Sequence, residues 1–232
     1  MIYKEVAPFY HSLFYDKKAI EDWVTITTEN IAGNNILECA CGLGDVAAIL
    51  KKRGKNIIAS DQSEEMGKQV KKLYPNLEFI QMDMTNFTVE KCFDGIICYC
   101  DSINYLKNIN ELKLFLTQAY DHLNVNGKLI FDMHTMLRLE EFKLEYIEEG
   151  VVNDVDYLWS IIAKDKNLIH NFVFYTDSKT IYENHVQYVF SRDEVESCLV
   201  DVGFEFVVKT DFIYDGYQDG EKYFYICRKR KK

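Results

Sequence analysis

Two acidic residues, each at the end of an apolar run, are best placed in this chain to do chemistry. Glu38 ends a run that begins at Asn35, and a short glycine-containing segment follows it as far as Gly44. Asp61 ends the next apolar run, which begins at Asn56. Buried parallel strands would bring both carboxylates to one edge of a sheet, and the glycines would let the backbone approach a ligand. The pattern is typical of an α/β protein that holds an adenosine-containing cofactor.

The elements that must position these residues follow from the spacing of apolar side chains. Apolar positions near 3.6 spacing predict helices over the first thirty residues. Strands and helices then alternate, which predicts a doubly wound, parallel α/β sheet. The expected strands are 35–39, 56–60, 77–82, 93–99 and 127–133, and the expected helices are 44–53, 63–73 and 108–123.

From about residue 146 the periodicity changes from helical to two residues. Three runs rich in β-branched and aromatic residues are separated by short polar turns, and they predict an antiparallel meander over 151–163, 168–177 and 180–190. A helix over 191–201 and strands over 204–209 and 223–227 should follow. Because the helical pattern returns, we expect a single domain over 1–232. Its special features would be an N-terminal helical lid over 1–32 and an antiparallel β insertion over about 146–190.

Composition and charge limit the classes of protein that this chain can represent. It has 232 residues, 48% of them hydrophobic, which suits one α/β domain with a full core. The formal net charge is -10, and we interpret the basic group at 228–232 as a solvated tail, so we expect no DNA partner. No apolar run is long enough to span a membrane, and we expect a cytoplasmic location. The seven cysteines lack zinc spacing, so no metal is expected.

In the order of its motifs, the chain resembles the class I S-adenosylmethionine-dependent methyltransferases over roughly residues 30 to 230. The first motif of that family is an acid, a small residue and a glycine turn, and here it runs from Glu38 to Gly44. Ala40 replaces a more usual glycine and should fit if its φ is negative. A dinucleotide dehydrogenase would have a third spaced glycine where Ala47 stands. The resemblance implies a mostly parallel, seven-stranded, Rossmann-like sheet and S-adenosylmethionine as the cofactor.

The resemblance also assigns cofactor contacts to residues at four successive strand ends. Asp61 would accept the ribose hydroxyl groups, and it could also cap the helix over 63–73. Asp83 would accept the adenine amino group, or merely close a turn, and Met84 would cover the adenine ring. The cofactor-binding residues that we expect are Glu38, Ala40, Gly42, Gly44, Asp61, Gln62, Asp83, Met84, Asp101 and Tyr15.

The sequence gives fewer indications of the residues that contact the methyl acceptor than of those that contact the cofactor. Tyr10 and Tyr15 could offer ring faces to a cationic donor, or could simply pack into the core. His134 follows the fifth strand and should face the acceptor. His185 lies in the meander, where alternation places it on one strand face with Glu183 and Gln187. Either histidine could be a general base, and either could be purely structural.

We therefore expect a metal-independent methyltransferase that acts on a small molecule, as a monomer or a homodimer. N-methylation is favoured over O-methylation, because the resemblance is closest to small-molecule enzymes with an insertion after the fifth strand, including N-methyltransferases of amino sugars and glycine. Three alternatives stay open. They are a tRNA or protein methyltransferase, a non-catalytic S-adenosylmethionine-binding protein, and an NAD-dependent enzyme.

Overall fold

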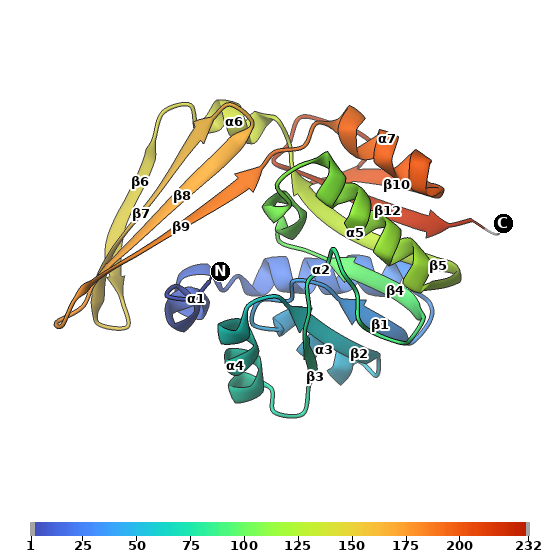
Figure 1. The fold of residues 1–232 in the computed structure, drawn as a ribbon, viewed down its shortest axis with the longest axis horizontal. Coiled ribbons are helices and arrows are strands. Elements are labelled where there is room, and N and C mark those ends of the chain that lie inside the picture. The colour runs from blue at the N-terminus through green and yellow to red at the C-terminus, as the bar shows by residue number, and fades with distance from the viewer. Residues whose placement is uncertain (1–2, 231–232) are drawn as a thin grey trace.

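The computed structural model describes residues 3–230 and contains two β-sheets (Figure 1). The larger sheet has the strand order β11-β10-β12-β5-β4-β1-β2-β3. Five of its strands run parallel: β1 (Asn35–Glu38), β2 (Asn56–Asp61), β3 (Glu78–Gln81), β4 (Phe93–Cys98) and β5 (Leu123–His134). The others are antiparallel: β10 (Phe204–Thr210), β11 (Tyr214–Asp215) and β12 (Lys222–Lys229). The predicted mostly parallel sheet is confirmed, with the two-residue strand β11 in addition to the seven expected strands.

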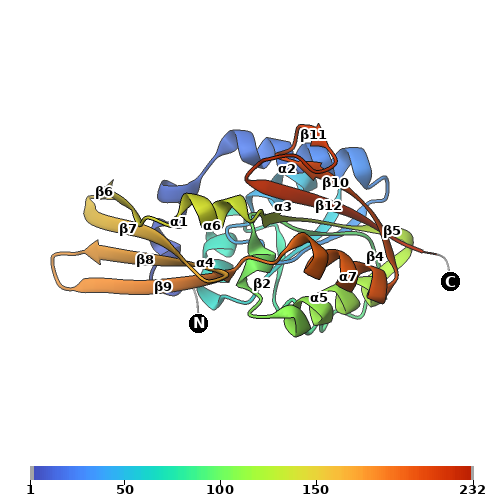
Figure 2. The ribbon, with the colours of Figure 1, turned by 90° about the horizontal axis from the view of Figure 1, so that it is seen from above.

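Helices cover both faces of this sheet (Figure 2). Helices α2 (Lys17–Asn30) and α3 (Asp45–Lys52) lie on one face, and α5 (Ile109–His122) and α7 (Arg192–Val202) lie on the other. Successive strand residues therefore enter different cores. Ile36 of β1 packs into the core beneath α2 and α3, and Leu37 packs into the core beneath α5 and α7. The remaining helices are α1 (Ala7–Phe14), α4 (Glu64–Leu73), α6 (Leu137–Glu141) and the 3₁₀ helix η1 (Ser102–Tyr105).

The second sheet is an antiparallel meander with the strand order β6-β7-β8-β9. Its strands are β6 (Tyr146–Val152), β7 (Val155–Lys164), β8 (Asn167–Tyr175) and β9 (Thr180–Tyr188). The prediction of three runs was wrong by one strand, because Glu148, Glu149 and Gly150 hide the two-residue periodicity of β6. One face of this sheet packs against α1, where the rings of Phe9 and Phe174 stack with their centroids 4.2 Å apart.

The basic group at the C-terminus is partly built into the larger sheet. Arg228 and Lys229 belong to β12. The Lys229 ammonium donates hydrogen bonds of 2.7 and 2.8 Å to the carbonyl oxygens of Tyr120 and Leu123, which end α5. The interpretation of 228–232 as a solvated tail was therefore wrong for these two residues, and residues 231 and 232 lie outside the described part. Among the described helices, none is both long and apolar enough to cross a membrane.

Candidate active site

The carboxylates of Glu38 and Asp61 lie at the ends of two neighbouring parallel strands, as the sequence predicts. The loop after β1 turns back beneath Asp61, whose Oδ2 accepts a 2.9 Å hydrogen bond from the Gly42 backbone N–H. The other oxygen, Oδ1, accepts one of 2.8 Å from the Ser63 N–H. The cap of α4 is Ser63, whose hydroxyl accepts from the Met66 N–H. The prediction that Asp61 itself could also cap this helix is therefore wrong.

Three residues of this loop have left-handed backbone conformations. Gly42 and Gly44 have φ values of +54° and +78°, which suit glycine. A Cβ atom on Gly42 would meet nothing within 4 Å, so this part of the backbone borders open space. Gly44 instead packs toward α4 and the segment that follows it, because an added Cβ would lie 3.4 Å from Val70 and 3.1 Å from Leu77. Ala40 has φ +51°, so the condition of a negative φ that we set for alanine is not met.

Because left-handed alanine is strained, Ala40→Gly should stabilise the protein. The left-handed conformation costs about 1–2 kcal/mol for a residue with a Cβ, and the greater entropy of unfolded glycine offsets part of the gain. We expect the free energy of unfolding to rise by up to about 1 kcal/mol, measured by urea denaturation. Ala48→Gly, within the helix α3, makes the same chemical change and should instead lower it by about 1 kcal/mol. A loss of stability in Ala40→Gly would contradict the strain.

A cavity of about 960 Å³ opens beside this loop. Most of the predicted cofactor residues line it, namely Glu38, Ala40, Gly42, Asp61, Gln62, Asp83, Met84 and Tyr15. They come from the ends of β1, β2 and β3 and from the segment after α1. The structure thus brings together residues that are up to 69 positions apart in the sequence. Their roles toward a cofactor stay predictions.

The two carboxylates at this cavity are buried, and burial raises the pKa of both. The pKa of Glu38 is raised to about 8 and that of Asp61 to about 6. The Oε2 atom of Glu38 has no hydrogen-bond partner among the described residues, although the side chain is only 3% exposed. A buried carboxylate oxygen without a partner is a ready acceptor for a cationic group of a ligand.

Asp83 closes a turn and also lines the cavity, so the turn does not exclude the predicted adenine contact. Its Oδ1 accepts hydrogen bonds from the backbone N–H and the hydroxyl of Thr85, at 2.8 and 2.7 Å, so it does close the turn. Its Oδ2 lies 3.3 Å from the Gln62 amide nitrogen, which donates to it. The residue is also exposed and lines the cavity, so its carboxylate is still accessible to a ligand.

Asp101 was expected at the cofactor, and the structure places it elsewhere. It is not among the residues that line the cavity, although its neighbours Cys100 and Ser102 are. Its backbone is left-handed (φ +54°), and its Oδ2 accepts a 2.6 Å hydrogen bond from the partly buried ammonium of Lys222. This ion pair holds the carboxylate behind the cavity wall, which is the physical reason for the difference.

Lys222 and a second acid form a buried network with Asp101 that the sequence did not reveal. Asp132 of β5 accepts from the Asp101 backbone N–H at 3.0 Å and from the Trp23 indole N–H at 3.1 Å. The Lys222 ammonium is 3.6 Å from Asp132. Burial raises the pKa of Asp132 to about 6. Burial alone would also raise the pKa of Asp101, but His134 and Lys222 hold it below its usual value.

His134 is also buried behind the cavity wall and does not face the cavity as predicted. Its Nε2 lies 3.0 Å from the Gln187 side-chain oxygen, and its Nδ1 is 3.4 Å from Asp101 Oδ1. Burial lowers the pKa of this imidazole. The network around Asp101 therefore accounts for the position of His134.

His185 is fully buried but reaches the cavity through a tyrosine. Its Nε2 lies 2.7 Å from Glu183 Oε1, and its Nδ1 lies 3.3 Å from the hydroxyl of Tyr105, which lines the cavity. Tyr105 in turn shares a 2.6 Å hydrogen bond with the hydroxyl of Tyr3. Glu183, His185 and Gln187 are 9%, 1% and 5% exposed, so the prediction that they share one strand face is confirmed.

The carboxylate of Glu183 also anchors the N-terminal segment. It accepts hydrogen bonds from the backbone N–H groups of Lys4, Glu5 and Val6, at 3.2, 2.6 and 2.9 Å. These groups precede α1, which has no side-chain cap of its own. Glu183 lies 178 positions from Glu5, so no local sequence signal could have revealed this contact. The helical lid over 1–32, described here from residue 3, stays a prediction.

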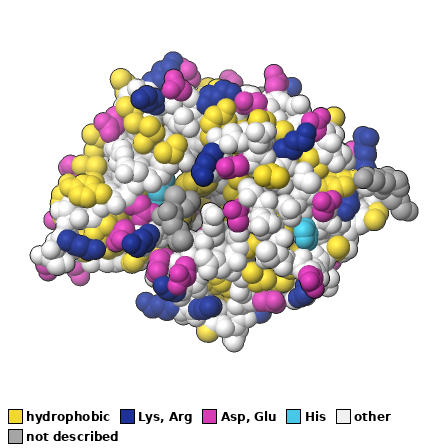
Figure 3. All heavy atoms as spheres, viewed as in Figure 1, with side chains coloured by type: hydrophobic (Ala, Val, Ile, Leu, Met, Phe, Trp, Pro, Cys, Tyr) yellow, Lys and Arg dark blue, Asp and Glu magenta, His cyan; other side chains and the backbone are white. Residues whose placement is uncertain are grey.

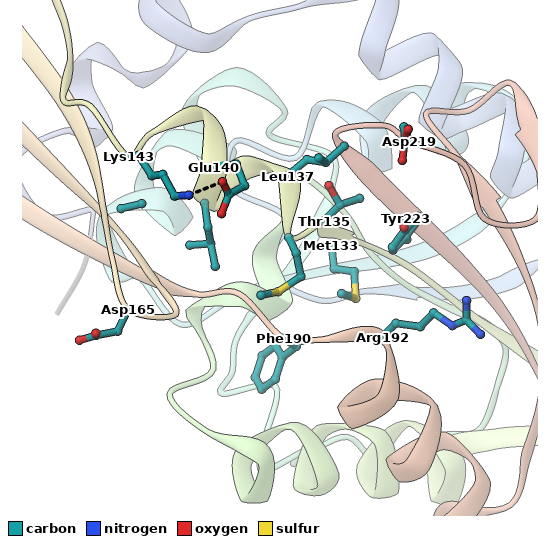
Figure 4. Close-up of a pocket in the computed structure, with 13 residues that line it drawn as sticks. Met133, Thr135, Leu137, Glu140, Lys143, Asp165, Phe190, Arg192, Asp219 and Tyr223 are labelled. Atoms are coloured by element: carbon teal, nitrogen blue, oxygen red, sulfur yellow. Dashed lines mark hydrogen bonds and ion pairs between the residues drawn. The ribbon is translucent and has the colours of Figure 1, made fainter.

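A second cavity, of about 520 Å³, lies between the two sheets and shares no lining residue with the first (Figure 4). Met133, Phe190 and Tyr223 give it an apolar wall. Three of its charged residues have ion-pair partners, since Lys143 pairs with Glu140 and Arg192 pairs with Glu196. This cavity contains none of the predicted cofactor residues.

Comparison with known proteins shows that this chain is similar to methyltransferases. Residues 36–127 match the sequence family described as "Methyltransferase domain". The chain is 29% identical over 217 residues to the putative methyltransferase YqeM of Bacillus subtilis, covering 88% of this chain and 87% of that protein. It is 24% identical over 255 residues to a putative methyltransferase of Geobacillus, covering 99% and 100%.

Solved structures show the same fold. An S-adenosylmethionine-dependent methyltransferase from Clostridium acetobutylicum superposes with a TM-score of 0.83 at 21% identity, covering 99% of both chains. The sugar N-methyltransferase KedS8 from Streptoalloteichus has a TM-score of 0.79 at 19% identity, covering 97% of this chain and 92% of that one. The fold is that of the class I methyltransferases. The chain itself is a methyltransferase, and the NAD-dependent alternative is wrong.

Proposed function

We propose that this methyltransferase transfers the methyl group to a nitrogen atom of a small molecule. The observation that carries the proposal is the continuity of the cavity, which extends from Glu38 and Gly42 to the side chains of Tyr3, Tyr10 and Tyr105. Its volume of about 960 Å³ is at the upper end of ligand pockets, which suits a donor and a small acceptor together.

The residues at the first end of the cavity fit the donor. S-adenosylmethionine, when bound, supplies an electrophilic methyl group on a positively charged sulfur. Glu38, whose buried Oε2 atom has no partner among the described residues, would pair with its ammonium group. Asp61 would accept the ribose hydroxyls, Asp83 would accept the adenine amino group, and Met84 would cover the ring. The open space beside Gly42 leaves room for this contact with the backbone.

The other end of the cavity favours an amine acceptor. Burial raises the pKa of Tyr3, Tyr10 and Tyr105, so their hydroxyls are neutral at pH 7. Their rings offer π faces to a cationic amine or to the donor sulfur. Two similar proteins support the same chemistry: the sugar N-methyltransferase KedS8, and an N,N-dimethyltransferase of Streptomyces venezuelae, 25% identical over 99 residues.

An amine must lose a proton during this reaction, and we assign the terminal base to His185. The nitrogen lone pair forms the new N–C bond while the S–C bond breaks. The nitrogen proton passes to the Tyr105 hydroxyl, whose own proton passes to Nδ1 of His185, 3.3 Å away. Glu183, 2.7 Å from Nε2, stabilises the imidazolium that forms. His134 makes no such contact with a cavity residue among its hydrogen bonds, so we give it a structural role.

Two measurements test the proposed function. Thermal shifts with S-adenosylmethionine, S-adenosylhomocysteine and NAD should show stabilisation by the first two only; stabilisation by NAD alone would overturn the cofactor assignment.

The enzyme is then incubated with a panel of small amines and matched alcohols, and formation of S-adenosylhomocysteine is followed. We expect turnover with an amine. Turnover with alcohols alone, or with tRNA or protein alone, would contradict small-molecule N-methylation.

The raised pKa of Glu38 predicts a pH dependence of donor binding. Below pH 8 the free carboxyl is largely protonated, because its pKa is about 8. The proton must leave before the carboxylate can pair with an ammonium group, so the affinity for S-adenosylhomocysteine should fall as the pH falls from 8 to 6, by at most about tenfold per pH unit. Calorimetry in buffers of different ionisation enthalpy should detect the released proton. Glu38→Gln should bind more weakly at pH 8 and lose this proton release; a variant that kept it would contradict the role of Glu38.

A further inference from the structure

We propose that two copies of this protein pair through the face of the second sheet that α1 does not cover, which we call the open face. It consists of every second residue of the four strands, and these residues lie opposite one another in rows across the sheet. Three of the rows are Glu149–Leu158–Val173–Tyr182, Ile147–Ser160–Asn171–Asn184 and Ile162–Ile169–Val186. The opposite face is already covered. There Phe172 and Phe174 are buried, and α1 packs against them.

The composition of the open face is unusual for a surface exposed to water. In an antiparallel sheet with one solvated face, alternation normally places polar side chains outward. Here apolar residues occupy many outward positions, and Ile147, Val151, Tyr182 and Val186 are 54%, 67%, 70% and 51% exposed. In Figure 3, hydrophobic side chains gather at the left, where Figure 1 shows this sheet. Exposed apolar side chains gathered on one sheet face in this way indicate an interaction surface.

The size of the open face suits a second copy of the same chain. Its strands are 7 to 10 residues long. Such a four-stranded face measures about 30 by 19 Å, and stacking two of them would bury on the order of 1,200 Å². That area is at the lower end of specific protein–protein interfaces. Two sheets stacked face to face about 10 Å apart form a β-sandwich, which is a stable arrangement.

The charges at the two ends of β7 indicate how the copies are oriented. Asp156 lies at one end of the open face and Lys164 at the other, and both are exposed. Within residues 3–230 neither side chain takes part in an ion pair. A twofold axis that lies between the two faces and runs perpendicular to the strands would reverse the strand direction in the second copy. Each Asp156 would then lie opposite a Lys164 of the second copy. The interface would then be self-complementary, as twofold symmetry requires.

Pairing would also complete the wall of the active-site cavity. Asn184 and Val186 belong to the open face and line the cavity at the same time. Leu114 of α5 lines the same cavity and is 52% exposed. A second copy seated on the open face would therefore lie beside the acceptor entrance and reduce the access of water to it.

The test is the oligomeric state of the full chain in solution. Light scattering after size exclusion should give the mass of two chains at micromolar concentration. Tyr182→Lys with Val151→Lys would place charges in the interface, and we expect dimerisation to weaken by about 100-fold or more. The matched control is Val207→Lys with Ile213→Lys, which changes two equally exposed apolar residues away from the open face and should stay dimeric. A monomeric wild type, or a dimer unaffected by the first pair, would overturn the proposal.

A charge exchange tests the orientation. Lys164→Glu should weaken the dimer by about tenfold, and adding Asp156→Lys should restore it. A combined variant that dimerises no better than Lys164→Glu alone would overturn the antiparallel arrangement. Binding of S-adenosylhomocysteine, measured in parallel, should be unchanged in all these variants, since none of the substituted residues lines the cavity. Failure of this proposal can thus be distinguished from failure of the proposed function.

Discussion

Asp61→Asn should weaken the binding of S-adenosylhomocysteine by about 100-fold. The carboxylate already holds the loop through the Gly42 N–H and the start of α4 through the Ser63 N–H, at 2.9 and 2.8 Å. An amide can accept through only one of its two positions, so it cannot keep both backbone contacts and still accept the ribose hydroxyls. Losing a hydrogen bond to a charged group costs about 1.5–3 kcal/mol, and 2.8 kcal/mol corresponds to about 100-fold.

Isothermal titration calorimetry at pH 8 measures this effect with Asp61 fully ionised, because its pKa is about 6. The control is Asp121→Asn, the same change at an exposed position on α5, which should leave the affinity unchanged. The thermal unfolding of Asp61→Asn shows whether the loop is still formed. A folded variant with unchanged affinity would remove Asp61 from the ribose contact.

Lys222→Met should lower the free energy of unfolding by about 3 kcal/mol at pH 7, because it leaves two buried carboxylates without their cation. The side chains of Asp101 and Asp132 are 10% and 0% exposed, and the ammonium is 2.6 and 3.6 Å from their oxygens. Urea denaturation measures the loss. The control is Lys209→Met, which breaks a surface ion pair with Asp215 and should cost less than about 1 kcal/mol.

The loss in Lys222→Met should shrink as the pH falls. The pKa of Asp132 in the folded protein is about 6, above its ordinary value, so protonation favours the folded state as the pH drops below 7. Without Lys222 the pKa of this carboxyl should rise further, and the recovery between pH 7 and pH 5 should exceed that of the wild type. Adding Asp132→Asn to Lys222→Met should also restore part of the loss at pH 7. If neither change restores stability, the cost comes from packing and not from charge.

The sequence predicted the parallel sheet and the donor end of the cavity because both depend on local patterns. An apolar run that ends in an acid and a glycine turn places Glu38, Gly42 and Asp61 with little reference to the rest of the chain. Strand β6 was missed because polar residues interrupt its periodicity. The backbone of Ala40 was misjudged because a residue type alone does not determine φ where the surrounding loop imposes it.

The residues that surround the acceptor end depend on contacts between distant segments. Lys222 reaches Asp101 from 121 positions away, and that ion pair draws both Asp101 and His134 away from the cavity. The Glu183 carboxylate meets backbone N–H groups, which carry no sequence signature at all. Side-chain alternation correctly grouped Glu183 with His185, but only the three-dimensional structure shows which cavity residue they approach.

The alternation of β9 has one further consequence. Its inward side chain Glu183 accepts a hydrogen bond from the segment before α1, and its outward side chain Val186 lines the cavity. One strand therefore contacts both the N-terminal segment and the cavity. By thermodynamic reciprocity, an acceptor that steadies β9 would steady this N-terminal contact by the same free energy, and the converse holds equally.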